Sequence, residues 1–141
     1  LGLATAAVDR ARRYVRSEAR KQPGVTSPAA LRLAELVTVF HQMEATVEAA
    51  VKTFDDVRED PDILDSMGFA LDMNGLKVCT STLVVDVANR AMGVCGISGY
   101  REDSQYSLGR ILRDAHGAAV MVNNDRIIAN NAQMLLVHKE D

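Results

Sequence analysis

A long run of apolar side chains at helical spacing sets the strongest limit on the fold of this chain. The run opens at Ser27-Pro28, a hydroxyl cap followed by proline at the first helical position. Its apolar positions recur three or four residues apart, at Leu33, Leu36, Val37, Phe40, Met43, Val47, Val51 and Phe54. This period is typical of a helix with one buried face, so the sequence predicts a helix over residues 28–57.

Other segments of the chain repeat this helical period. A first helix ends before Gln22-Pro23-Gly24, because proline disfavours helical geometry in the residue before it. Asp60-Pro61 repeats the cap-plus-proline signal, and a later cap is expected within residues 123–125. The predicted helices cover residues 1–20, 28–57, 61–94, 108–115 and about 125–137. Gly68 and Gly75 lie seven apart on one face of the third helix, and we expect a neighbouring helix to approach there.

These helices predict an all-α fold, an up-down bundle of three long and two shorter helices forming one domain over residues 1–141. Hydrophobic residues make up 48% of the chain, but aromatic residues only 4%, and there is no tryptophan. The core is therefore built from aliphatic side chains and alanine, a mixture that favours helix packed on helix.

Composition excludes several classes of function. The net charge of −3 gives no electrostatic footprint for nucleic acid, and no apolar run approaches the length of a membrane span. Two cysteines, Cys79 and Cys95, match no metal spacing and are expected to be buried free thiols of a cytoplasmic protein. Leu1 already lies inside a helical pattern, so we expect the chain to begin within a longer protein.

Residues 96–117 form the most informative local pattern. A glycine loop closed by an aromatic side chain, with Gly96, Gly99 and Tyr100, leads into an amphipathic helix that contains Arg113-Asp114. Glycine lets a backbone approach a ligand or another backbone closely, and a helix start offers free N–H groups to an anion. The pattern predicts a loop that faces a cofactor or an interface.

Four segments in this order resemble the C-terminal helical domain of the acyl-CoA dehydrogenase superfamily. The chain's first helix resembles the first helix of that domain, and the segment from Arg20 to Gly24 resembles its Arg-x-Gln-Phe-Gly turn. The segment from Ala91 to Tyr100 resembles the family's Gln-x-x-Gly-Gly-x-Gly-Tyr loop. Arg113-Asp114-Ala115 resembles the Arg-Asp-Ala that follows it. The four segments follow the family's order and spacing, and the resemblance covers essentially the whole chain.

The resemblance implies an FAD enzyme whose N-terminal helical and middle β domains lie outside this chain. Arg20 matches an arginine that reaches the FAD pyrophosphate of a neighbouring subunit, with Gln22 beside it in the turn. Gly96 and Gly99 match the loop that approaches the partner's FAD adenosine. Asn124 falls where the family has a threonine near its own flavin. No metal is implied.

Several positions depart from the family pattern. Pro23 replaces the phenylalanine of the turn, and Gly93 and Ile97 replace the glutamine and second glycine of the loop. The usual catalytic glutamate aligns with Val122, and valine cannot abstract a proton. Some branches place this glutamate before the first helix of the domain, so we expect the base upstream of Leu1.

The resemblance implies α,β-dehydrogenation of an acyl thioester carried by CoA or by an acyl carrier protein. The domain would contribute to flavin binding and to a homodimer or homotetramer, and the fragment alone would be inactive. One alternative is a flavin monooxygenase of the same fold. Another is a non-enzymatic helical domain that only mediates assembly.

Charged residues outside the motifs have simpler interpretations. Arg113-Asp114 is expected to form a salt bridge between helices, and His116 to serve packing or capping, although an oxygen-activating branch would give His116 a role. Asp125 is expected to cap the last helix. The basic end of the first helix is either a solvated face or a surface for phosphates of FAD or CoA, or for an acidic carrier protein. Its members are Arg10, Arg12, Arg13, Arg16, Arg20 and Lys21.

Overall fold

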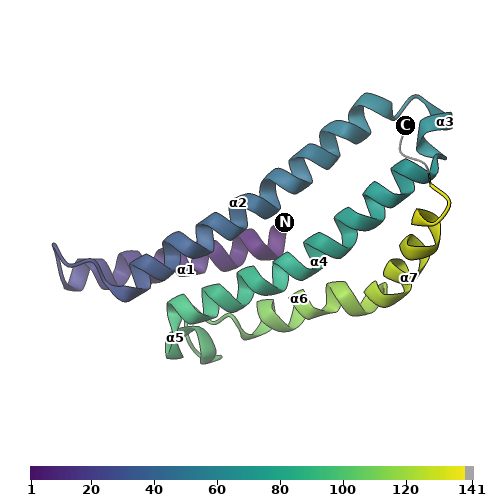
Figure 1. Ribbon diagram of the computed structural model, residues 1–141. Coiled ribbons are helices and arrows are strands. Elements are labelled where there is room, and N and C mark those ends of the chain that lie inside the picture. Colours follow the sequence, from purple (N-terminus) through teal and green to yellow (C-terminus); the bar gives the residue numbers. More distant parts are fainter. Residues whose placement is uncertain (139–141) are drawn as a thin grey trace.

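The computed structural model describes residues 1–138, and every regular element in that range is a helix (Figure 1). This confirms the predicted all-α class. The helices are α1 (Gly2–Lys21), α2 (Pro28–Val57), α3 (Pro61–Leu64), α4 (Met67–Cys95), α5 (Ile97–Tyr100), α6 (Gly109–Met121) and α7 (Asn124–Leu135).

Helix α4 is the centre of the bundle. It packs against α1, α2, α6 and α7, and α1 also contacts α2 and α6. Figure 1 shows α2 and α4 as two long helices side by side, with α6 and α7 following α4 along its other side. Among the described residues, no helix is long and apolar enough to cross a membrane.

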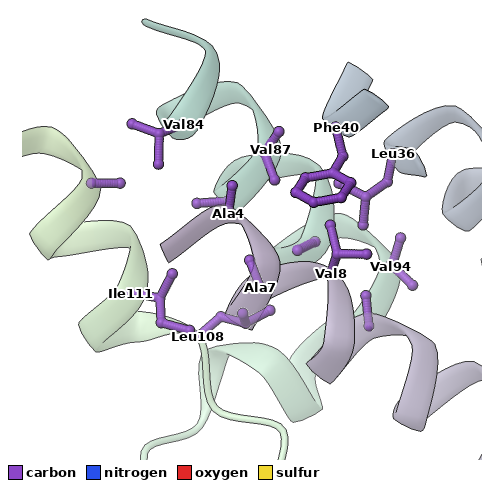
Figure 2. Close-up of a cluster of buried hydrophobic side chains, with 14 of the residues drawn as sticks. Ala4, Ala7, Val8, Leu36, Phe40, Val84, Val87, Val94, Leu108 and Ile111 are labelled. Atoms are coloured by element: carbon purple, nitrogen blue, oxygen red, sulfur yellow. The ribbon is translucent and has the colours of Figure 1, made fainter. Parts of the chain in front are cut away.

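The core lies where α1, α2, α4 and α6 meet (Figure 2). Alanines on α1 let its backbone approach the other helices, and larger aliphatic side chains fill the space between them. The labelled members are Ala4, Ala7, Val8, Leu36, Phe40, Val84, Val87, Val94, Leu108 and Ile111, all at most 6% exposed. The predicted aliphatic core is therefore present.

The ends of α2 agree with the sequence prediction, whereas the helix predicted over residues 61–94 is divided. Ser27 accepts a hydrogen bond from the backbone N of Ala30 at 3.2 Å, and α2 continues to Val57. Asp60 caps only the four-residue α3. The chain then turns, and the hydroxyl of Ser66 accepts from the backbone N of Phe69 at 3.2 Å to begin α4. A second cap six residues after the first ends one helix and starts another.

The segment predicted as a glycine loop is partly helical. Helix α4 ends at Gly96, whose φ of +55° lies in the left-handed region that favours glycine. One helical turn, α5, follows before the chain turns towards α6. The expected close helix approach at Gly68 and Gly75 was wrong. A Cβ built at Gly68 would lie 3.6 Å from His138, beyond the end of α7, and one built at Gly75 would have no atom within 4 Å.

Candidate functional site

The segment between α6 and α7 contains Val122, the residue that aligns with the family's usual catalytic glutamate. Val122 ends α6 in extended geometry and is exposed. The side chain of Asn123 accepts a hydrogen bond from the backbone N of Asp125 at 2.8 Å, so Asn123 is the cap of α7. The prediction that Asp125 is the cap was wrong, because Asp125 lies in the first turn and its own backbone N–H is the donor.

A polar cluster on α4 holds this segment in place. Lys77 donates to the backbone carbonyl of Val122 and, at 2.5 Å, to Oδ1 of Asn124. The Asn124 amide then donates to the hydroxyl of Ser81 at 2.9 Å, and Ser81 donates to the carbonyl of Val78 at 2.9 Å. The cluster fixes the Asn124 side chain towards α4, so one amide N–H remains for another partner.

An open hollow of about 310 Å³ lies beside this cluster. Lys77, Thr80 and Ser81 supply its polar groups, and apolar side chains from several helices form the rest of its lining. Among the described residues Lys77 forms no ion pair with a carboxylate. The apolar contributors are Leu1, Leu3, Met43, Val84 and Ala118.

Sequence reasoning missed Lys77 and Ser81. The available signal was their spacing, because residues four apart lie on the same face of a helix. Their partner Asn124 is more than 40 residues away in the chain. No local pattern connects the three residues.

The glycine turn after α4 packs tightly against the bundle. A Cβ added at Gly99 would lie 2.8 Å from the Cβ of Cys95, so the position requires glycine. The carbonyl of Gly99 accepts from the backbone N of Leu108 at 2.8 Å, and the Arg10 side chain donates to the carbonyl of Ser107. The close approach at Gly99 is therefore to the chain's own backbone and core.

The buried thiol of Cys95, beside this turn, is expected to be unreactive. Cys95 is 1% exposed, and burial raises the pKa of its thiol to about 11, with Arg10 offsetting part of the rise. Cys95 thus confirms the expected buried thiol. Cys79 does not, because it is exposed on α4.

Arg20, Gln22 and Gly96 are all exposed. Arg20 lies in the last turn of α1 and forms no ion pair with a described residue, whereas its neighbour Lys21 pairs with Glu18 at 2.6 Å. Gln22 lines a small hollow of about 120 Å³. A Cβ at Gly96 would meet no atom within 4 Å, so its surface is open to a partner.

The predicted site residues do not form a single site. Ser81, which binds Asn124, precedes Gly96 by fifteen residues of helix, which corresponds to about 20 Å along α4. Asn124 and Gly96 therefore do not meet in one site. The described residues contain no cluster of histidine, cysteine and carboxylate side chains that could hold a metal.

The remaining charged candidates lie on the surface of α6. Arg113 and Asp114 form an ion pair at 3.2 Å, and Arg110 lies 3.6 Å from Asp114. The expected salt bridge between helices was wrong, since all three residues belong to α6. His116 is exposed on the same helix.

The fold and its polar segments define a class: an all-helical bundle domain with a central long helix and a tight glycine turn at its end. The family model described as acyl-CoA dehydrogenase, C-terminal domain, matches residues 1–129. This chain belongs to that family. Comparison with curated proteins and with solved structures gives no match.

Proposed function

We propose that residues 1–141 are the C-terminal domain of a larger cytoplasmic FAD enzyme that dehydrogenates acyl thioesters at the α and β carbons. The observation that carries this proposal is the family match over residues 1–129, which spans every residue predicted to approach flavin. FAD supplies the hydride acceptor in this reaction. The acyl group would be carried by CoA or by an acyl carrier protein.

Arg20, Gln22 and Gly96 carry groups that suit the phosphate end of FAD. Arg20 is exposed and without an ion pair among the described residues, and a guanidinium donates paired hydrogen bonds to phosphate. Gln22 lies two residues away and adds an amide donor. The open backbone at Gly96 allows close approach of a ligand, whereas Gly99 is occupied by internal packing.

The residues of the Val122 segment have a different role in this proposal. Asn124 retains one amide N–H that can donate to a flavin of the same subunit. Val122 has no group that accepts a proton, so the base that removes the α-proton would come from the chain that precedes Leu1.

The proposed assembly is a homodimer or homotetramer in which each subunit completes its neighbour's flavin site. Large apolar side chains are exposed at the C-terminal end of α6, with Val120 at 77% and Met121 at 88%, and just after α7, with Leu136 at 85%. Exposed apolar residues of this kind support an interface.

The test uses the full-length purified enzyme. We expect bound flavin, its anaerobic reduction by an acyl thioester and release of the α,β-unsaturated product. Arg20→Met should lower the flavin content, whereas Lys21→Met, which removes a charge already paired with Glu18, should not. An intact protein that binds no flavin would support the assembly-only alternative. Incorporation of an oxygen atom into the product would support the monooxygenase alternative.

A further inference from the structure

Positive charge is concentrated on one helix of this acidic protein. The whole chain has a net charge of −3, yet its first helix is strongly basic. Against the acidic Asp9 and Glu18, α1 carries Arg10, Arg12, Arg13, Arg16, Arg20 and Lys21. The rest of the chain is therefore more acidic than the total suggests, and α1 is the site where an acidic partner would be attracted.

Three of these arginines form a continuous surface, which we call the arginine face: Arg12, Arg13 and Arg16. Together with Asp9 they line an open hollow of about 490 Å³. Arg16 follows Arg13 by three residues and Arg12 by four, which places the three side chains on one side of α1. The core contacts of α1 use its other side, through Ala4, Ala7, Val8, Ala11 and Val15.

Most of the charge on the arginine face is not neutralised within the described residues. Arg12 lies 3.6 Å from the carboxylate of Asp9. Arg13 and Arg16 are exposed and form no ion pair with a described residue, and Arg13 donates only to the backbone carbonyl of Asp9 at 3.4 Å. Two guanidinium groups about one helical turn apart are thus free to meet carboxylates.

The lining of the hollow discriminates between possible occupants. All four lining side chains are charged, and none is apolar or aromatic. A nucleotide such as the adenosine end of CoA needs an apolar or aromatic contact for its base. Carboxylates spaced three or four residues apart on a helix need only charge complementarity at the same spacing, and an exposed helix surface such as α1 can meet them.

We propose that the arginine face docks an acidic helix of an acyl carrier protein that delivers the thioester substrate. This inference rests on the proposed dehydrogenase function and specifies its substrate carrier. Arg20 is not part of the arginine face, because it lies one turn beyond Arg16 on α1 and does not line the hollow. Its proposed partner remains FAD. The carrier would be attracted by long-range charge, so its association should weaken with salt.

The experiment compares two forms of one acyl substrate on the full-length flavin-loaded enzyme. The first is the acyl group on an acidic acyl carrier protein, and the second is the same acyl group on free pantetheine. For Arg13→Glu/Arg16→Glu we expect kcat/KM with the carrier to fall at least about tenfold at low salt. We expect kcat/KM with pantetheine and the flavin content to stay unchanged. Raising the salt concentration should reduce the difference in kcat/KM with the carrier between the wild type and the variant.

A matched control makes the same change of charge elsewhere. Lys52→Glu/Arg58→Glu reverses two exposed basic residues on and just beyond α2 that have no ion pair among the described residues. This variant should keep kcat/KM with the carrier at the wild-type value. An equal loss from the control would overturn the proposal, because net charge and not the arginine face would then be responsible.

Three other results would also overturn the proposal that the arginine face docks a carrier protein. The Arg13→Glu/Arg16→Glu variant could keep its activity with the carrier, lose activity equally with both substrates, or lose flavin. In each case the proposed function still stands if the wild-type enzyme dehydrogenates the pantetheine thioester. If the wild-type enzyme acts on neither substrate, the proposed function itself fails.

Discussion

Replacing Gly99 by alanine is the most direct test of the packing around the glycine turn. The new Cβ would lie 2.8 Å from Cys95 Cβ, 3.2 Å from Leu108 Cδ1 and 3.3 Å from Met92 Sδ. The Met92 and Leu108 contacts involve side-chain ends that can rotate. The Cys95 Cβ is fixed to the backbone of α4, so relief requires α5 to move against α4.

The magnitude follows from two opposing effects. Inserting a methyl group into a packed core costs about 1–3 kcal/mol, whereas replacing glycine by alanine in a helix gains at most about 1 kcal/mol. We therefore expect Gly99→Ala to lower the free energy of unfolding by about 1–2 kcal/mol. Urea unfolding of the 141-residue chain, followed by far-ultraviolet circular dichroism, measures this change.

Gly75→Ala is the matched control. Gly75 lies inside α4, and an added Cβ has no atom within 4 Å, so only the helix-propensity gain applies. We expect this variant to be up to about 1 kcal/mol more stable than the wild type. The reasoning is refuted if Gly99→Ala gains stability alongside Gly75→Ala, because close contact with Cys95 would then carry no cost.

Three further predictions concern single side chains. A thiol reagent should label Cys79 in the folded chain and reach Cys95 only after unfolding, which mass spectrometry of labelled peptides would check. The raised Cys95 pKa means that the folded state favours the neutral thiol, so its stabilising effect is present below pH 9 and lost as the pH rises from 9 to about 11. Cys95→Ala should flatten the fall in unfolding free energy across that interval. Ser66→Ala should destabilise the chain by about 1 kcal/mol by removing the α4 cap. Ser17→Ala removes a hydroxyl that caps no helix, inside α1, and should not lower the stability in the same urea titration.

The long helices could be predicted because their signals are local. Ser27 and Pro28 lie next to each other, and the apolar period of α2 continues without interruption to Val57. The division between α3 and α4 could not be predicted in the same way. Asp60-Pro61 is a strong start signal, and the apolar period continues across Ser66, so the second cap is inconspicuous in the sequence.

The candidate site was only partly predictable for a related reason. Asn124 was found through its resemblance to a family motif, whereas Lys77 and Ser81 owe their place to the way α4 packs beneath α7. Gly99 was singled out as a loop glycine that could face a ligand. In the structure, glycine is required at this position because a Cβ would lie too close to Cys95, and this approach depends on the turn between α4 and α6.

Helix α7 has no buried residue and packs mainly on α4, through contacts that include the hydrogen bond from Asn74 to Asn131 at 2.8 Å. Elements with few buried apolar contacts open at a lower free energy than the core. Hydrogen exchange in α7 should therefore be faster than in α1 or in the second half of α4. The position of Asn124 is thus governed by a local opening equilibrium, and any ligand that binds it would slow exchange along the whole helix.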